Sequence, residues 1–343
     1  MQMSGAQSDP RSFHVPAADS APPLPTPPIR SPQARKKHRR WPWILGVLLL
    51  VALLPLYTFA SAWWTWGGVE RVDLRATLMG SQTATNYLVV GTDSREGVDI
   101  ETENAGVIFG VEGERTDTIA VLRVDGEEVS LLAIPRDLYV NVNGSPSRIN
   151  AAFARGGPEL LVQTVQNEIG IGIDHYLEMD FAGFLSLVDS LGGVTVNFPY
   201  PARDPKSGLN IAEAGPQVLD AGQALAYVRS RSYTEIIDGV DQRDPTADLG
   251  RVQRQQKFLA AVFAELGNTR NPFTLLGALD GVASNVRVDE SLGLSTVISL
   301  GLTIRGADPA TATLPTTRFF TPGGADVLLL DEPAAAPLID QFR

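Results

Sequence analysis

The chain has 343 residues, with 28 Lys and Arg against 39 Asp and Glu, a net charge of −11, and no cysteine. A hydrophobic content of 44% with 20% charged residues excludes a chain that is disordered throughout or wholly embedded in a membrane. The absence of cysteine and the presence of only three histidines exclude disulfide scaffolds, thiol catalysis and a zinc centre built from several histidines.

The charge is unevenly divided along the sequence. Residues 1–40 hold eight prolines and seven Arg and Lys against two Asp, a balance of +5. The remaining residues hold 21 basic and 37 acidic side chains, a balance of −16. A Pro-rich, basic segment has too little apolar surface to offset the entropy of ordering, so residues 1–40 are predicted to be a disordered tail.

Residues 41–66 are predicted to form a transmembrane signal-anchor helix. Residues 44–62 are 19 uncharged residues, enough to span a hydrocarbon core of about 30 Å, and all five tryptophans lie at the two borders of this stretch. The preceding basic run places residues 1–40 in the cytoplasm and the rest outside the membrane. We therefore expect a single-pass membrane protein with an external C-terminal domain. Signal-peptide cleavage after the small residues Ala60–Ala62 is the alternative.

The segment after the membrane is predicted to be a short amphipathic stalk over residues 67–85, followed by the first strand of a globular domain, residues 86–90. A loop rich in Gly and Glu then continues to Gly113. Two β-rich runs, residues 118–124 and 128–134, are joined at Asp125-Gly126, which predicts a β-hairpin.

Strands and helices alternate further along the chain. Helices are predicted over residues 147–153, 158–169, 181–191, 220–231 and 249–266, and strands over residues 174–179 and 194–198. This pattern predicts an α/β fold of the α-β-α type, a mixed central β-sheet covered by helices on both faces and preceded by one transmembrane helix. Residues 86–265 are assigned to the core of the external domain. Residues 266–343 are expected to complete the external domain and to end flexibly.

Arginines fall where predicted strands end and helices begin. Arg136 follows a strand, and Arg251 and Arg254 lie in the first two turns of a helix that Asp248 could cap. Cations at a helix start oppose the helix dipole, whereas free N–H groups there favour anions. A bound phosphate would compensate these arginines. Two solvated side chains are the alternative.

Two carboxylates occupy a similar setting. Asp93 ends the first predicted strand and Asp117 begins the second, each with an arginine two residues away, Arg95 and Arg115. If the strands are neighbours, the two acids could share a hard cation such as Mg²⁺, which binds oxygen ligands and substrate phosphates. Two separate ion pairs are the alternative.

Other motifs are absent or weak. The sequence contains neither a Walker-type phosphate loop nor a Gly-x-Ser-x-Gly elbow, and His175 in an alternating strand is expected to be structural. The strongly acidic external domain disfavours nucleic acid as a partner.

Six segments, in their order along the chain, resemble the LytR-CpsA-Psr (LCP) family of cell-envelope proteins. They are NYLVVGTDSR (86–95), RTDT (115–118), LAIPRD (132–137), RINAA (148–152), AYVRSR (226–231) and DLGRVQRQQ (248–256). Together they cover residues 86–265, about half of the chain. The basic tail and signal anchor are also arranged as in that family.

The resemblance implies a phosphotransferase that moves a glycopolymer from a polyprenyl-pyrophosphate carrier to peptidoglycan through a phosphodiester. It implies that Asp93 and Asp117 hold Mg²⁺, with Mn²⁺ as an alternative. By the same resemblance, the catalytic arginines that clamp the pyrophosphate are Arg115, Arg136, Arg229, Arg231 and Arg251. The expected neighbours of the pyrophosphate are Arg95, Arg148, Arg254, Gln255 and Gln256. Candidates for a groove that holds the prenyl chain are Phe181, Phe184, Leu185 and Val188.

Two other functions fit the same residues. One is a polyprenyl-pyrophosphate hydrolase, in which water replaces the sugar hydroxyl as the nucleophile. The other is a non-catalytic envelope module that binds prenyl-phosphate lipids. Asp93 and Asp137 are both candidates for the group that accepts the proton of the nucleophile. The glycopolymer, the acceptor hydroxyl and the oligomeric state are left open.

Overall fold

The computed structural model describes Leu53 and residues 56–81, 83–92, 116–246, 248–269, 271–305, 307 and 309–343. The predicted tail and most of the predicted membrane segment lie outside these residues. Within them, no helix is both long and apolar enough to cross a membrane. Residues 56–67 are helical and lead into the first strand.

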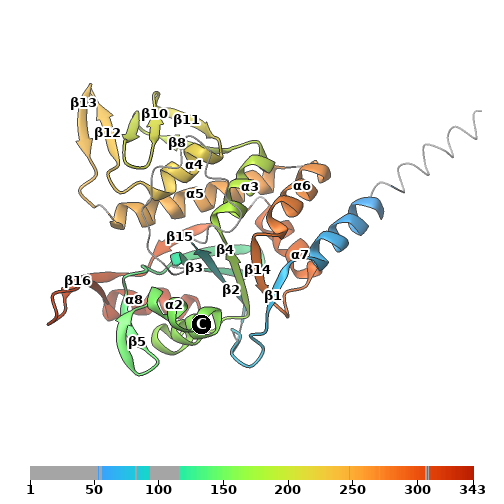
Figure 1. Ribbon diagram of the computed structural model, residues 1–343, viewed down its shortest axis with the longest axis horizontal. Helices are drawn as coiled ribbons and strands as arrows, with labels where there is room; N and C mark the ends of the chain where they lie inside the picture. The colour runs from blue at the N-terminus through green and yellow to red at the C-terminus, as the bar shows by residue number, and fades with distance from the viewer. Residues whose placement is uncertain are drawn as a thin grey trace, which may run out of the picture. The chain divides into compact units, whose positions relative to one another are not determined.

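A mixed seven-stranded sheet forms the centre of the fold, as predicted (Figure 1). In spatial order its strands are β1 (Glu70–Val72), β14 (Val286–Asp289), β7 (His175–Met179), β2 (Thr85–Thr92), β3 (Thr116–Asp125), β4 (Glu128–Ala133) and β15 (Ala310–Thr313). Strands β2, β3 and β4 form an antiparallel meander. The meander is extended by β7, parallel to β2, and by β15, parallel to β4.

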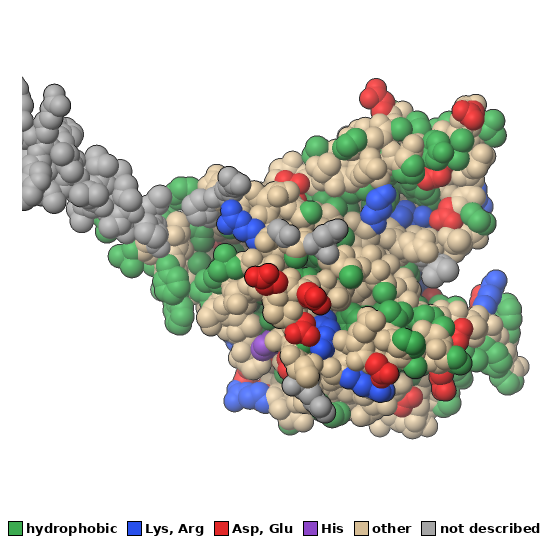
Figure 2. Space-filling model, turned by 180° about the vertical axis from the view of Figure 1, so that it is seen from behind, with side chains coloured by type: hydrophobic (Ala, Val, Ile, Leu, Met, Phe, Trp, Pro, Cys, Tyr) green, Lys and Arg blue, Asp and Glu red, His purple; other side chains and the backbone are tan. Residues whose placement is uncertain are grey.

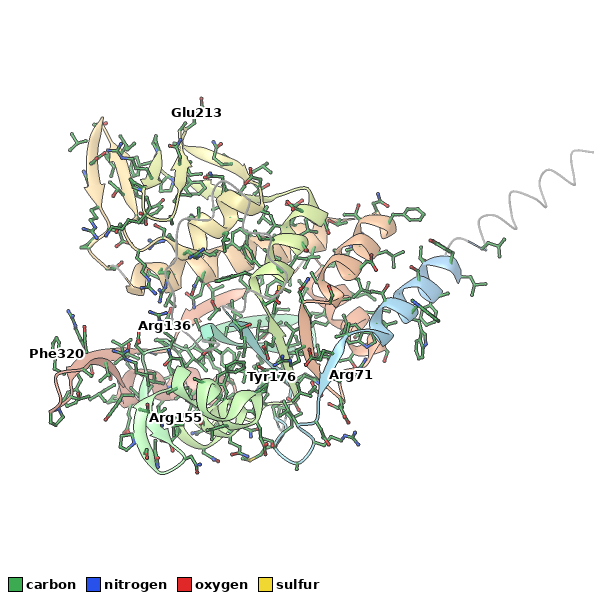
Figure 3. The ribbon with its side chains drawn as sticks, viewed as in Figure 1. Arg71, Arg136, Arg155, Tyr176, Glu213 and Phe320 are labelled. Atoms are coloured by element: carbon green, nitrogen blue, oxygen red, sulfur yellow. The ribbon has the colours of Figure 1, made fainter. Side chains whose placement is uncertain are left out.

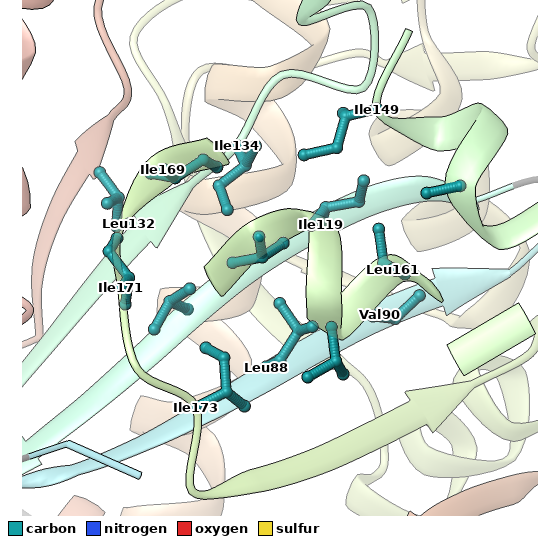
Figure 4. Packing of buried hydrophobic residues seen from close by; sticks show 14 of the residues in the cluster. Leu88, Val90, Ile119, Leu132, Ile134, Ile149, Leu161, Ile169, Ile171 and Ile173 are labelled. Atoms are coloured by element: carbon teal, nitrogen blue, oxygen red, sulfur yellow. The ribbon is translucent and has the colours of Figure 1, made fainter. Parts of the chain in front are cut away.

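Helices cover both faces of this sheet (Figure 1). The helices on one face are α2 (Asn150–Thr164), its π-helical continuation η1 (Val165–Ile169) and α8 (Glu332–Gln341); those on the other face are α5 (Asp248–Asn268), α6 (Pro272–Ala283) and α7 (Leu294–Ile304). Successive strand residues point to opposite faces, so Leu88 and Val90 pack with α2 and α8 (Figure 4), whereas Tyr87 packs with the other three helices.

A second core lies beyond α5 and contains the elements that carry most of the predicted arginines. These elements are α3 (Phe181–Leu191), β8 (Val194–Phe198), β9 (Ala202–Asp204), β10 (Leu209–Ile211), β11 (Gly215–Leu219), α4 (Ala221–Arg229), β12 (Thr234–Ile237) and β13 (Val240–Arg243). Asp180 and Asp220 cap α3 and α4 by accepting from the amides of Gly183 and Gln223, each at 2.8 Å. The shared core includes Val188, Phe198 and Tyr227.

Two further hairpins complete the described part, and one of them corrects a prediction. They are β5 (Tyr139–Val142) with β6 (Ser145–Arg148), and β16 (Thr316–Phe320) with β17 (Asp326–Leu330). Residues 147–153 were expected to be one helix, but β6 occupies the first two of them. The reason is a tight turn in which Asn143 and Gly144 both have positive φ, which folds β6 back onto β5. Helix α2 therefore begins only at Asn150.

The second predicted helix in this region begins where expected. The backbone of Gly156 and Gly157 is not helical, so α2 consists of two helical segments separated by a kink. The second segment begins at Pro158 and continues through η1 to Ile169, which are the predicted bounds. Proline is suited to the first turn of a helix, because the N–H that it lacks would have no partner there.

The predicted domain limits differ from the arrangement observed. Residues 67–85 were expected to be a stalk, but β1 pairs with β14 and Leu74 is fully buried in the core. The limit at residues 265/266 falls within α5, and strands β14 and β15 beyond it belong to the central sheet. Strands near both ends of the described chain thus belong to the same central sheet. The described residues from Leu53 onward are parts of one compact unit.

Candidate active site

The N-terminal half of α5 connects the end of α4 to the central sheet. Arg254 Nη2 donates to the carbonyl of Ser230 at 2.8 Å, and Gln255 Nε2 donates to that of Val228 at 3.3 Å. On the sheet side, the Gln256 amide donates to the carbonyl of Ala312 and accepts from Thr313 Oγ1 at 3.1 Å. Three consecutive predicted neighbours of the pyrophosphate, residues 254–256, thus fix the two layers to each other.

The same contacts bring Arg136 to this edge of the sheet. Thr313 pairs with Ala133, the last residue of β4, and Ile134 continues the ladder by donating to Ile119 of β3 at 2.8 Å. Arg136 comes three residues after the end of β4. Figure 3 shows Arg136 between the sheet and the layer that contains α4 and α5.

Arg229 and Arg231 are positioned by a carboxylate that the sequence analysis did not identify. Asp204 is fully buried at the end of β9, and its Oδ2 accepts from Ser230 Oγ at 2.7 Å, from the Arg231 amide at 3.1 Å and from the Ser232 amide at 2.8 Å. These bonds hold the chain in the turn directly after α4. Arg229, in the last turn of α4, places its guanidinium 5.4 Å from the centre of the Phe181 ring, a cation–π contact.

The charge of Asp204 is maintained by its hydrogen bonds. Burial alone raises the pKa of this carboxyl, but the donors from Ser230, Ser232, Lys206 and Arg231 outweigh burial and lower the pKa below its ordinary value. Asp204 is therefore ionised at neutral pH. The Asp204 carboxylate is therefore a buried negative charge bound to the turn that contains Arg231 and directly follows Arg229.

Arg251 and Arg254 are both buried in α5, with 3% and 7% of their surface exposed. The Arg254 side chain is used within the fold: Nη1 lies 2.7 Å from Asp244 Oδ2, and the guanidinium lies 4.6 Å from the centre of the Tyr233 ring. Although burial raises the pKa of Asp244, hydrogen bonds from Thr246 and Arg254 lower that pKa on balance. Arg254 thus braces the segment around Arg231 and Arg251.

Replacing Arg254 by Lys is expected to destabilise the protein by about 2–4 kcal/mol, because an ammonium cannot bind Asp244, bind Ser230 and stack on Tyr233 at once. Thermal unfolding of the full-length chain measures this. The matched control is Arg243→Lys, an exposed arginine that donates to Ser232 Oγ at 3.2 Å, which should change stability by less than about 0.5 kcal/mol. Equal effects of the two variants would contradict the bracing role.

Asp137 links two further predicted residues. Its Oδ2 lies 3.5 Å from Arg136 Nε and its Oδ1 lies 3.3 Å from Arg148 Nε. Arg148 also donates to the carbonyl of Asp326 at 2.9 Å, which ties it to β17. The carboxylate considered as a proton acceptor is therefore engaged by two guanidinium groups on different elements.

The predicted metal ligands, Asp93 and Asp117, lie at or next to a part of the chain that the structure does not describe. Asp93, Arg95 and Arg115 lie outside the described residues, and only the backbone of Asp117 is described. That backbone shows that β2 and β3 are neighbours, which is the condition for the two acids to meet. Residue 117 is the extra residue of a β-bulge, since Thr92 pairs with Thr116 and Gly91 with Thr118. Bulges of this kind redirect a side chain and are frequent beside active sites.

The four candidates for the prenyl groove lie on α3, and three of them pack into the second core. Val188 is fully buried in the second core, and Phe184 packs on Phe258 with ring centres 5.3 Å apart. Leu185 packs against the same core. Phe181, under Arg229, is the member of this set that contacts a predicted catalytic arginine.

The two structural carboxylates share a local sequence pattern that could have identified them. Asp204 and Asp244 each precede a proline, and each accepts from the amide two residues ahead, of Lys206 at 2.9 Å and of Thr246 at 2.8 Å. Asp before Pro favours such a turn. The turn occupies one carboxylate oxygen and leaves the other for a distant partner, which local sequence does not reveal.

Two other features lie apart from the arginines. A groove of about 600 Å³ beside α7 and the start of β2 contains none of the predicted site residues.

His175 lies in the central sheet and has the structural role expected from the sequence. Its ring stacks on Tyr87, and its Nδ1 lies 3.3 Å from Asp289 Oδ2. On the face opposite to Figure 1, Lys and Arg side chains are spread over the surface and alternate with carboxylates (Figure 2).

Comparison with known proteins identifies related sequences and folds. The LytR_cpsA_psr family matches residues 69–336. The chain is 37% identical to "Probable cell wall biosynthesis protein LcpB" of Corynebacterium glutamicum over 88% of this chain and 70% of that protein. It is 34% identical to "Polyisoprenyl-teichoic acid--peptidoglycan teichoic acid transferase TagU" of Halalkalibacterium halodurans over 62% of this chain and 64% of that protein. The solved structure "LytR-Csp2A-Psr enzyme from Actinomyces oris" has a TM-score of 0.63 and 28% identity over 80% of this chain and 95% of that one.

The matched range includes all six motif segments and every arginine of the candidate site. It also includes β1 and β15, the two edge strands of the central sheet. The resemblance inferred from the motifs is thereby confirmed, and the chain belongs to the LytR-CpsA-Psr family.

Proposed function

We propose that this protein is an extracytoplasmic phosphotransferase that moves a glycopolymer from a polyprenyl-pyrophosphate carrier to peptidoglycan. The observation that carries the proposal is the position of Arg136, Arg229, Arg231 and Arg251 on the elements joined where α4, α5 and the edge of the sheet meet. Guanidinium groups bind phosphate oxygens in a bidentate manner, so four arginines on these joined elements suit a pyrophosphate. The transferase names of relatives support the reaction class.

The reaction exchanges the phosphoanhydride bond of the pyrophosphate for a phosphate ester bond to the acceptor. The acceptor hydroxyl oxygen forms a bond to the phosphorus that bears the glycan, and the bond from that phosphorus to the bridging oxygen breaks. Prenyl monophosphate leaves, and the proton of the hydroxyl is transferred to a base. Negative charge builds up on the bridging and equatorial oxygens, so fixed positive charge lowers the barrier.

The arginines can be assigned roles from their positions. Arg229 and Arg231, on either side of the turn held by Asp204, would bind one phosphate of the donor. Arg136, held by Asp137 at the edge of the sheet, and Arg251 on α5 would bind the other. Arg254 and Gln256 keep these two pairs at a fixed separation through their contacts within the fold.

The surroundings of Asp93 and Asp117 fit a hydrated divalent cation such as Mg²⁺. Thr92 and Thr116, which directly precede the two acids, are both buried, and neither hydroxyl oxygen has a hydrogen-bond partner. Buried hydroxyl groups normally find a partner, and metal-bound waters would provide one. When bound, the cation would neutralise phosphate charge. In our proposal Asp93 and Asp117 hold it.

Removing the metal is expected to abolish transfer. The purified full-length chain should lose activity by about 10²-fold or more in EDTA and recover it with Mg²⁺ or Mn²⁺, because several kcal/mol of charge stabilisation is lost. Asp117→Asn should show the same loss and should not be rescued by Mg²⁺. The control is Asp241→Asn, an exposed carboxylate paired with Arg203. Full activity in EDTA would refute metal assistance, and the arginine assignment would stand on its own tests.

The membrane anchor belongs to the same proposal. The uncharged residues 44–62 overlap the first part of helix 56–67, and the basic residues 35–40 precede them. We place the N-terminus in the cytoplasm and the folded unit outside the cell membrane. A lipid-borne donor and an anchored enzyme would then share one surface, which raises their effective concentration.

A further inference from the structure

Exposed apolar side chains are concentrated on three helices. Among the described residues, sixteen large hydrophobic side chains are exposed, and nine of these lie on helix 56–67, α6 and α7. They are Leu56, Tyr57, Phe59, Trp63, Trp64, Phe273, Leu275, Ile298 and Leu302. Scattered exposed hydrophobic residues are ordinary, whereas a gathering of this size normally indicates a binding surface.

The three helices lie together at one end of the unit and share one core. Figure 1 shows helix 56–67 beside α7, with α6 next to it. Their inner sides pack into a single cluster that contains Trp66, Leu279 and Val297. Thr65 Oγ1 also donates to Asp280 Oδ1 at 3.3 Å, and Arg71 Nη1 donates to the carbonyl of Leu292 at 3.2 Å. The three helices therefore form one layer of the fold, and the exposed side chains on them form the surface of that layer.

The outer side of α6 and α7 has little charge to keep it in water. The two helices contain one charged residue, Asp280. Ile298 and Leu302 lie one turn apart on α7 and are 42% and 64% exposed. The neighbouring side of α7 has the hydroxyl groups of Ser295 and Ser299, which face the groove at β2. Ile298 and Leu302 can therefore enter the apolar part of a lipid bilayer without taking a charged side chain of α7 out of water.

The sequence before helix 56–67 identifies the occupant of this surface. The apolar stretch of residues 44–62 includes the first part of the helix, and the exposed Trp63 and Trp64 directly follow this stretch. Tryptophans at such a position mark the level of the lipid headgroups. Since Thr65 and Trp66 contact the α6 and α7 layer, that layer is next to the same bilayer. Hydrophobic side chains are visible at this end of the molecule in Figure 2.

We propose that Phe273, Leu275, Ile298 and Leu302 insert into the outer leaflet and dock the folded unit on the membrane at a second place, besides its anchor. This inference rests on the proposed anchoring of the chain. Docking would restrict rotation of the unit about the anchor and hold the arginine site at a fixed height above the lipid. A donor whose prenyl chain lies in that leaflet would then reach the site in one orientation.

The absence of cysteine allows a direct test by site-specific labelling. Single cysteines are introduced by Ile298→Cys and Leu302→Cys, and at a matched control by Val218→Cys, 67% exposed on β11. Each full-length variant is labelled with bimane and reconstituted in vesicles of phosphatidylcholine and phosphatidylglycerol, with or without brominated acyl chains. Bromine quenches only fluorophores within the bilayer. Quenching is expected at 298 and 302 and not at 218. Equal quenching at all three positions, or none at 298 and 302, would overturn the proposal.

Two further readouts separate the alternatives. If a second copy of the chain covers this surface instead, the bimane signal will change with the ratio of protein to lipid and not with bromine, which also overturns the proposal. The double variant Ile298→Asp/Leu302→Asp is expected to lower transfer from a long-chain donor in vesicles by about tenfold and to leave transfer from a water-soluble short-chain donor unchanged. If the wild-type chain transfers nothing, the proposed function fails, while the quenching result still decides docking.

Discussion

Replacing Arg229 by Ala is expected to lower kcat for glycopolymer transfer by about 10²–10³-fold, with a small change in thermal stability. The side chain lies at the end of α4 over the ring of Phe181, and in our proposal its charge binds a phosphate of the donor. Removal of one preorganised group that stabilises charge in a transition state has an effect of this size. Steady-state kinetics with a synthetic polyprenyl-pyrophosphate glycan and a peptidoglycan acceptor measures it.

Two companion variants sharpen this result. Arg229→Lys retains the charge but not the planar fork, so an intermediate loss of about tenfold is expected. Arg155→Ala is the control, because Arg155 is exposed, donates to Ser147 Oγ at 2.9 Å and lies far below the site (Figure 3). Full activity of Arg229→Ala would mean that the phosphate binds elsewhere.

The second large effect is expected from Asp204→Asn, which should destabilise the fold by about 2–4 kcal/mol. Asp204 is fully buried and accepts from Ser230, Arg231 and Ser232 through one oxygen and from Lys206 through the other. An amide can accept at one position only, and its NH₂ group would oppose buried donors. Thermal unfolding should show a clear drop in Tm, compared with almost none for the exposed Asp241→Asn.

This destabilisation should depend on pH in a defined direction. The folded-state pKa of Asp204 is lowered, so the stability it contributes is present above the unfolded value, near 4, and is lost as pH falls through the folded value. The difference in Tm between wild type and Asp204→Asn should therefore be constant from about pH 5 to 7 and narrow below about pH 4. A difference that grew on acidification would contradict the assigned ionisation.

The elements predicted best were those with strong local signals. For α3, an apolar stripe followed by glycine predicted residues 181–191, and these residues are helical, with Asp180 as the cap in the structure. Strand β8 also matches its predicted residues 194–198, since alternating side chains there face the second core. The hairpin of β3 and β4 followed from Asp125-Gly126, where Gly126 adopts the positive φ that the turn requires.

The parts that could not be predicted depend on contacts distant in sequence. Strand β1 is three residues long, and only its pairing with β14, more than two hundred residues away, makes it a strand. Likewise, no local pattern links Asp204 to Ser230 or Asp244 to Arg254. The motif arginines were recognisable by sequence, but the carboxylates that position them were determined by tertiary structure.

Product analysis is the most direct test of transfer at this site. The full-length chain is incubated with Mg²⁺, a polyprenyl-pyrophosphate glycan and peptidoglycan, and the phosphorus-containing products are identified by NMR and mass spectrometry. We expect a phosphodiester between glycan and peptidoglycan together with prenyl monophosphate, formed by wild type and not by Arg229→Ala. Formation of free glycan phosphate at the same rate with or without peptidoglycan would instead show a hydrolase and contradict the proposed transfer.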